Sequence, residues 1–308
     1  MFDIFLCALL PLTMTAAVAG MISDVGIAGG MTFGRETGEI VSAAKFRSEP
    51  PIRRYEVSAP IKSRVARGLP KINGPANISL PLVVIDAGHG GHDPGAISPH
   101  GGNREKDITL AIAKTVRDEL LKTGRVRVAL TRDSDNFIIL QDRYGIARNM
   151  QADLFISIHA DSAENKDATG GTVYTLSEVA SDREAQRLAA RENKSDIING
   201  VNLGGADANV SSILIDLTQR ETMGVSADFA KLLMREAKPN MRLRSNSHRF
   251  ASFIVLKAPD TPSVLFETGY LSNEQDVAFL SSAEGQQKVG RSVASAIQVH
   301  FARRLASR

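Results

Sequence analysis

Two histidines and two glutamates lie beside short apolar runs, and they are the residues of this chain best suited to chemistry. His89 follows the run at 83–88, His159 follows the run at 154–158, and Glu267 follows the run at 263–266. Glu105 opens the helical pattern that comes after the first run. A short apolar run rich in β-branched residues and bounded by glycine is typical of a buried strand.

Side chains just beyond the carboxyl ends of parallel strands converge on one crevice. Two imidazoles and one carboxylate gathered there suit a catalytic Zn²⁺ that keeps one position open. A second carboxylate nearby suits a general base. The pattern therefore predicts a zinc-dependent hydrolase, and we expect its substrate to contain an amide bond.

Each of these residues also has an ordinary structural interpretation. The glycine-rich loop around His89 could cradle phosphate, but it lacks the spacing of the known phosphate-binding motifs. Glu105 could simply favour the helix dipole, and a basic neighbour could satisfy Glu267. Asp86 or Asp161 could orient a ligand imidazole, or either could be a cap or turn residue.

The remaining histidines are weaker candidates. His92 and His100 lie on the glycine-rich loop and are candidates for substrate contact. His248 falls in a polar stretch that we interpret as a loop, and His300 lies on the last helical pattern, where we expect a surface or structural role.

Alternating strand and helix patterns from Leu80 onward predict an α/β fold with a mostly parallel twisted sheet flanked by helices. The expected strands are Leu82–Asp86, Arg125–Leu130, Leu154–Ile158, Thr172–Leu176, Phe253–Leu256 and Ser263–Phe266. The expected helices are Glu105–Lys122, Gln141–Met150 and Ala283–Leu305.

A long helical insertion is expected at 177–252. Its predicted helices are Ser181–Ile198 and Val210–Lys238, which Asn202–Asn209 separates. The second helix carries an apolar stripe, for which we favour a place in the core over a partner-binding role.

The amino-terminal region indicates export. Residues 1–19 have an apolar stretch followed by Ala17-Val18-Ala19, which is typical of a secretory signal peptide, although no basic residue precedes the stretch. The chain's single cysteine, Cys7, lies there, so a mature protein would have no disulfide or thiolate metal site. Residues 20–79 are interpreted as a basic linker or the remnant of an amino-terminal domain, and 80–308 as the catalytic domain.

Composition narrows the class of partner. The net charge of +3 and the pI near 9.0 favour anionic surfaces in general. The chain has no tryptophan and no nucleic-acid-binding motif, so we expect no nucleic-acid partner. No other apolar run is long enough to span a membrane, so no stable membrane insertion is expected after signal removal.

Several motifs, taken in order, resemble those of the zinc-dependent N-acetylmuramoyl-L-alanine amidases of the amidase_3 family. The likeness is closest to the periplasmic cell-division amidases of Gram-negative bacteria, and it extends from about Leu82 to Phe301. The segments that carry it are 84–91, 93–96, 105–107, 131–132, 142–143, 152–161 and 267–273.

The resemblance implies roles for the four residues. His89, Glu105 and His159 would bind Zn²⁺ and Glu267 would be the catalytic base, in a phosphorylase/hydrolase-like α/β fold. The substrate would be peptidoglycan, cleaved between the muramic lactyl group and L-alanine. The location would be the periplasm and the process daughter-cell separation.

The insertion is similar to the segment that covers the active site of the division amidases until an activator displaces it. On this resemblance, Glu192 would occupy the open position on zinc, with Glu184 as the second candidate, and a LytM-type protein would be the activator. The alternative is a surface helix with solvated charges. Too few residues precede Leu80 for the amino-terminal wall-targeting domain of these amidases.

Two other functions remain open. One is a different exported zinc peptidase or deacetylase acting on the cell wall. The other is a catalytically inactive wall-binding module, which the retained set of histidines and glutamates disfavours.

Overall fold

The computed structural model describes residues 68–165, 167–195 and 212–306. Its strands are β1 (Leu82–Ala87), β2 (Arg127–Leu130), β3 (Leu154–His159), β4 (Gly171–Leu176), β5 (Leu243–Ala251) and β6 (Ser263–Glu267). Its α-helices are α1 (Glu105–Leu121), α2 (Leu140–Asn149), α3 (Arg183–Glu192), α4 (Ser212–Ala237), α5 (Glu274–Ser281) and α6 (Ala283–Ala306).

The strands form one sheet in the order β2-β1-β3-β6-β4-β5. The pairs β1–β2, β1–β3, β3–β6 and β4–β5 are parallel, whereas β4 runs antiparallel to β6. The predicted α/β class with a mostly parallel sheet is confirmed. Because β1, β3 and β6 are parallel neighbours, their carboxyl ends meet at one edge.

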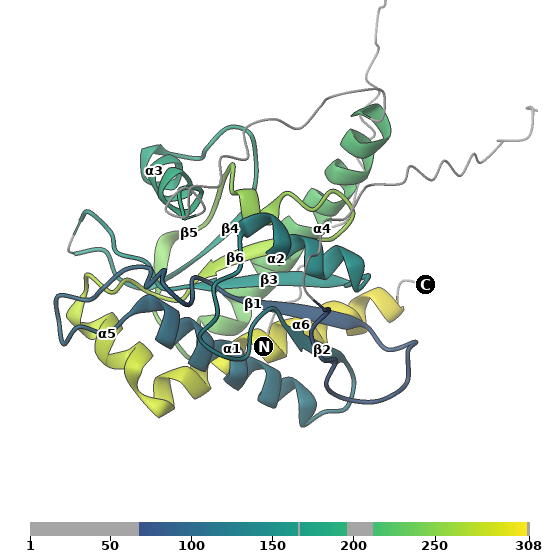
Figure 1. Ribbon diagram of the computed structural model, residues 1–308, viewed down its shortest axis with the longest axis horizontal. Helices are drawn as coiled ribbons and strands as arrows, with labels where there is room; N and C mark the ends of the chain where they lie inside the picture. Colours follow the sequence, from purple (N-terminus) through teal and green to yellow (C-terminus); the bar gives the residue numbers. More distant parts are fainter. Residues whose placement is uncertain (1–67, 166, 196–211, 307–308) are drawn as a thin grey trace, which may run out of the picture. The chain divides into compact units, whose positions relative to one another are not determined.

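Helices cover both faces of this sheet (Figure 1), with α1, α5 and α6 below it and α2 and α3 above it. Strand residues alternate between the two cores, so Val83 and Ile85 belong to the core that also contains residues of α1, α4, α5 and α6. Val84 packs on the other face with residues of α2 and α3. Strands buried on both faces explain the continuous apolar runs in the sequence.

Three elements differ from the sequence-based expectation. Phe253–Leu256 was predicted as a strand, but Ile254–Leu256 is a 3₁₀ helix. The polar stretch around His248 was interpreted as a loop, but it belongs to β5 at the sheet edge. Helix α5 was not predicted; Asn273 caps it by accepting hydrogen bonds from the backbone of Gln275 and Asp276.

The insertion at 177–252 is helical only in part. It contains α3 and α4, as expected, but it also supplies the edge strand β5. Phe229, Leu232 and Leu233 of α4 are buried in the core, which agrees with the favoured interpretation of its apolar stripe. The predicted break at 202–209 lies outside the described residues.

The signal peptide predicted at 1–19 lies outside the described residues, as does the linker predicted at 20–79 up to residue 67. The described end of this linker reaches the sheet, where Asn73 forms an antiparallel bridge with Val128. Among the described helices, none is both long enough and apolar enough to cross a membrane.

Candidate metal centre

The structure brings the four predicted residues to the carboxyl edge of the sheet. His159 and Glu267 end the neighbouring strands β3 and β6 and lie opposite each other in the register. His89 comes two residues after β1, and Glu105 is the first residue of α1. All four side chains are buried.

The carboxylate of Glu105 lies between the two imidazoles. Its Oε2 is 3.1 Å from Nε2 of His89, and its Oε1 is 3.1 Å from Nδ1 of His159. The same oxygens accept hydrogen bonds from the backbone N–H groups of Ala96 and Ala160, each at 2.9 Å. These bonds fix the carboxylate between the histidines.

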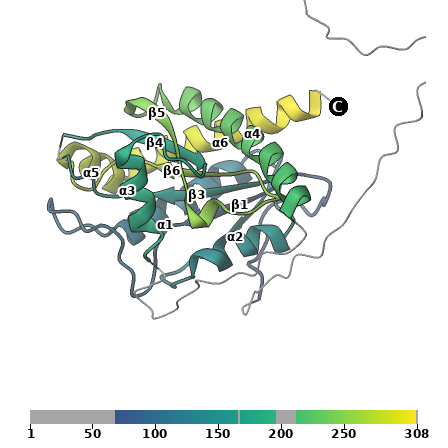
Figure 2. The same cartoon turned by 90° about the horizontal axis from the view of Figure 1, so that it is seen from above.

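A second carboxylate reaches the same place from α3. Oε2 of Glu192 lies 3.6 Å from Nε2 of His89 and 3.3 Å from Nδ1 of His159. One ligand atom from each of these three residues lies within 4.8 Å of the others, and all three are buried. Seen from above (Figure 2), α3 lies beside the ends of β3 and β6.

The second autoinhibitory candidate, Glu184, has a different position. Its carboxylate accepts hydrogen bonds from Arg244 and Arg249 of β5. Of the two candidates, Glu192 is therefore the one that reaches the histidines.

The residue that orients His89 is Asp93, which the sequence analysis did not single out. Oδ2 of Asp93 lies 2.8 Å from Nδ1 of His89, which leaves Nε2 directed to another partner. Asp86 and Asp161, the two predicted candidates, bond elsewhere. Asp86 accepts hydrogen bonds from Thr131, Ser157 and Arg143, and Asp161 pairs with Arg191.

The site fits a metal ion. Nε2 of His89 is buried and makes no well-directed hydrogen bond, although Oε2 of Glu105 lies 3.1 Å away, as expected of two atoms that would share an ion. His89 also has a φ of 61°, a left-handed conformation that is uncommon outside glycine and is often kept for function. Imidazole nitrogen and carboxylate oxygen are the donors that zinc takes in hydrolases.

Two glycines make room for this cluster. A Cβ atom on Gly88 would lie 2.5 Å from the ring of His159, and one on Gly95 would lie 2.7 Å from Oε2 of Glu105. Gly95 also has a φ of +65°. These clearances explain why the loop between β1 and α1 is rich in glycine.

Glu267 lies beside the cluster with one oxygen uncommitted. Its Oε2 accepts a hydrogen bond from the backbone N–H of Asp161 at 3.0 Å, whereas its buried Oε1 has no partner. Burial, together with the neighbouring charges of Asp161, Glu105 and Glu192, raises the pKa of Glu267 well above its ordinary value. A buried carboxylate with a raised pKa and a free oxygen is suited to accepting a proton.

Two buried arginines hold the loop that carries His89. Arg132 donates hydrogen bonds to the carbonyl groups of Ala87 and Gly88 at 2.9 and 2.8 Å. Arg143 donates to Oδ1 of Asp86 at 2.9 Å and to the carbonyl group of His89 at 2.8 Å. Both arginines stand in motifs of the resemblance, but no pattern in the sequence indicated which groups they bind.

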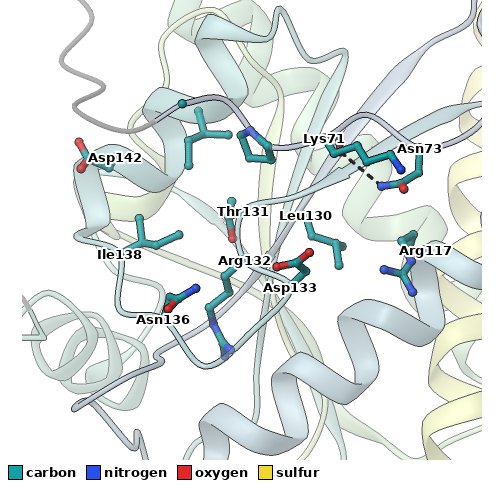
Figure 3. A pocket seen from close by; sticks show the side chains of 13 residues that line it. Lys71, Asn73, Arg117, Leu130, Thr131, Arg132, Asp133, Asn136, Ile138 and Asp142 are labelled. Atoms are coloured by element: carbon teal, nitrogen blue, oxygen red, sulfur yellow. Dashed lines mark hydrogen bonds between the residues drawn. The ribbon is translucent and has the colours of Figure 1, made fainter.

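A separate hollow lies at the carboxyl end of β2 (Figure 3). Residues from the segment before β1, from α1, from β2 and from α2 line it. Arg132 is one of the lining residues, but its guanidinium is committed to the His89 loop. None of the residues of the histidine cluster lines this hollow.

The other histidines have structural contacts. The ring of His92 packs on Phe137 with the centroids 4.3 Å apart, and Nε2 of His100 lies 3.3 Å from the carbonyl oxygen of Ser272. His248 bonds Thr175. His300 is buried beside Phe229, so its structural interpretation is the correct one.

The fold and this site together define an α/β protein with a buried histidine–carboxylate centre suited to a divalent metal. The sequence model of the Amidase_3 family, described as N-acetylmuramoyl-L-alanine amidase, matches residues 83–299. The chain belongs to this family.

Curated relatives agree with the family. AmiC of Escherichia coli O6:H1, named N-acetylmuramoyl-L-alanine amidase, is 39% identical over 231 residues, covering 74% of this chain and 55% of AmiC. AmiA of E. coli K12 carries the same enzyme name and is 39% identical over 221 residues, covering 71% of this chain and 76% of AmiA. The chain thus spans little more than half the length of AmiC.

Solved structures show the same fold. The catalytic domain of the amidase CwlV from Bacillus (Paenibacillus) polymyxa has a TM-score of 0.53 and 28% identity, covering 72% of this chain and 99% of CwlV. The amidase AmiC2 of Nostoc punctiforme has a TM-score of 0.51 and 30% identity, covering 72% of this chain and 97% of AmiC2.

Proposed function

We propose that this protein is a zinc-dependent N-acetylmuramoyl-L-alanine amidase that hydrolyses the amide bond between the lactyl group of N-acetylmuramic acid and L-alanine in peptidoglycan. The observation that carries the proposal is the meeting of His89, Glu105 and His159 beside Glu267. The enzyme names of AmiC and AmiA supply the substrate class.

His89, Glu105 and His159 would hold the ion. The backbone hydrogen bonds to Glu105 and the Asp93 contact to His89 would orient two of these ligands. Zinc bound there would supply Lewis-acid polarisation of the scissile carbonyl and of the attacking water. A cleft bordered by Ile97 and Lys194 leads to the cluster and gives the substrate a route to it.

Glu267 would act as the base through its free Oε1. It would take a proton from the attacking water as the water oxygen bonds to the amide carbon. It would then give that proton to the nitrogen of L-alanine as the carbon–nitrogen bond breaks. The second proton of the water passes from the new carboxyl group to the released amine, so the products are a lactyl carboxylate and a peptide with an ammonium terminus, and atoms and charges balance.

We further propose that the resting enzyme is blocked by α3. Glu192 would take the position at the ion that the substrate carbonyl needs, because its oxygen lies among the same ligand atoms. A LytM-type activator would displace α3. Export to the periplasm, which a peptidoglycan substrate requires, and a part in daughter-cell separation complete this proposal.

Analysis of digested peptidoglycan tests the activity. The zinc-loaded protein, with α3 released by activator or by substitution of Glu192, should create free amino termini on L-alanine, matched by free lactyl carboxylates on the muramic acid, and no other new end groups. New amino groups on the sugars would indicate a deacetylase, and new termini elsewhere in the peptide would indicate a peptidase. Binding to the wall without any cleavage would indicate an inactive module.

A further inference from the structure

The carboxylate of Glu184 on α3 is held by two arginines of β5. Arg244 and Arg249 each donate a hydrogen bond to it, the latter at 2.9 Å. The side chain of Arg249 is only 9% exposed and that of Arg244 is 17% exposed. Two partly buried guanidinium groups therefore bind one carboxylate. Hydrogen bonds between such charged groups are stronger than neutral ones, so this arrangement suits an acidic ligand.

The acidic partners of these two arginines come from one segment. Besides Glu184, the carboxylate that Arg249 approaches is Asp182, the cap of α3, at 3.6 Å. The other contacts of Arg244 are to Tyr270, whose hydroxyl lies 3.2 Å away and whose ring centroid lies 5.4 Å from the guanidinium carbon. Removal of α3 would leave both arginines without the carboxylates that they contact here.

The arginine pair lies near the candidate base. In the sheet, Glu267 of β6 is opposite Thr172 of β4, and Gly171 of β4 is opposite Leu243 of β5. Arg244 is thus about two strands from Glu267, or roughly 10 Å at the usual strand spacing. Tyr270 comes three residues after Glu267, and its hydroxyl contacts Arg244. The chain segment that follows the candidate base therefore reaches this arginine.

A pocket beside α3 borders Tyr270 and Glu184, the two residues that contact Arg244. It is lined by Tyr174 and Tyr270 together with Glu184 and Arg191 of α3. The hydroxyl of Tyr174 is buried and has no hydrogen-bond partner in the described part of the chain. Tyr174 lies opposite Arg249 in the register of β4 and β5, so its buried hydroxyl is a further polar group near this arginine that a ligand could satisfy.

The spacing of two glutamates on α3 gives the size of that ligand. Glu184 and Glu192 are eight residues apart, so they are separated by about 12 Å along the helix. Glu192 lies at the metal cluster and Glu184 lies at the arginines. An extended peptide covers 12 Å in about three to four residues.

We infer that Arg244 and Arg249 form a subsite for a carboxylate of the substrate's peptide, which Glu184 occupies in this structure as Glu192 occupies the metal cluster. The inference rests on the proposed amidase function. On this view α3 imitates the substrate at two points, the reacting carbonyl and a carboxylate about three to four residues beyond it.

The test compares two soluble probes, an N-acetylmuramoyl tripeptide with free peptide carboxylates and the same compound with carboxamides. It uses the full zinc-loaded chain with Glu184→Gln and Glu192→Ala, which removes the α3 carboxylates from the arginine pair and from the metal cluster. The KM for the free-carboxylate probe should be about tenfold lower, with a similar kcat, because hydrogen bonds to a charged group are lost in the other probe.

Arg244→Gln in the same protein should remove this preference by raising KM for the free-carboxylate probe alone, and Arg244→Lys should keep part of it. Arg242→Gln is the matched control, because Arg242 precedes β5 and bonds Gln275 instead. Cleavage with equal KM for the two probes before any arginine is changed would overturn the subsite while leaving the amidase intact. Cleavage of neither probe would overturn both proposals.

Discussion

Oε2 of Glu192 lies 3.3 Å from Nδ1 of His159, although one residue belongs to a helix and the other to a strand of the sheet. The glutamate is the last residue of α3, and the histidine is the last residue of β3. One helix end therefore contributes a carboxylate to the site where the substrate carbonyl is expected. This contact brings the end of α3 to the histidine cluster, and the proposed block depends on it.

Replacing Glu192 by Ala should raise the basal rate of peptidoglycan cleavage, by roughly tenfold or more if the blocked form dominates the resting population. The physical reason is that the helix would lose the carboxylate that competes for the ion. Dye release from labelled cell walls, without activator, measures the rate. Gln186→Ala is the control, because Gln186 is exposed on the same helix; an unchanged or lower rate for Glu192→Ala would contradict the block.

Replacing Glu267 by Gln should lower kcat by about 10²- to 10⁴-fold, the usual contribution of a general base. The amide side chain keeps the size of the carboxylate but cannot accept the proton. Zinc content and melting temperature should stay close to those of the wild type. Glu274→Gln, at an exposed position of α5, provides the comparison; near-normal turnover in the Glu267 variant would remove this residue from the mechanism.

Replacing Arg143 by Met should lower the free energy of unfolding by about 3 kcal/mol, because it leaves the buried carboxylate of Asp86 unpaired. It should also loosen the His89 loop, whose carbonyl group Arg143 binds. Urea denaturation measures the change. Arg148→Met should cost less than about 1 kcal/mol, because its partner Asp260 is 44% exposed; equal effects would show that the buried pair is not special.

Stability should fall on mild acidification because of His300. Burial, aided by Arg304, lowers the pKa of His300 to about 4. The folded state therefore favours the neutral ring, and its contribution is present above the unfolded pKa of about 6.5 and is lost as the pH falls toward 4. The expected loss between pH 7 and pH 5 is roughly 1 to 2 kcal/mol.

The variant His300→Leu identifies the source of that loss. It removes the titrating ring while keeping an apolar side chain beside Phe229. Urea denaturation at the two pH values should show a smaller pH dependence in the variant than in the wild type. The same slope in both proteins would assign the effect to other groups.

The sequence predicted the parts of the site that depend on parallel strands. His159 and Glu267 follow buried apolar runs, and the register of β3 with β6 places them opposite each other. The helix that begins at Glu105 was also predicted, with its end one residue too late, because its apolar positions repeat at helical spacing. Such local patterns determine where each strand or helix lies along the chain, and therefore which side chains stand at its end.

Other features depend on contacts that no local pattern contains. Strand β5 is polar because it lies at the sheet edge, so alternation did not reveal it. Asp93 orients His89 only because the loop turns back within four residues. The pairing of Glu184 with Arg249 joins distant segments, and charge alone did not predict it.

Zinc content measured by atomic absorption on wild type, His89→Ala and His159→Ala tests the central claim most directly, with wall digestion assayed on the same samples. The wild type should bind about one zinc ion per chain at a site of this kind, and each variant should lose both the metal and the activity while remaining folded. Full zinc content in both folded variants would contradict the metal centre described here.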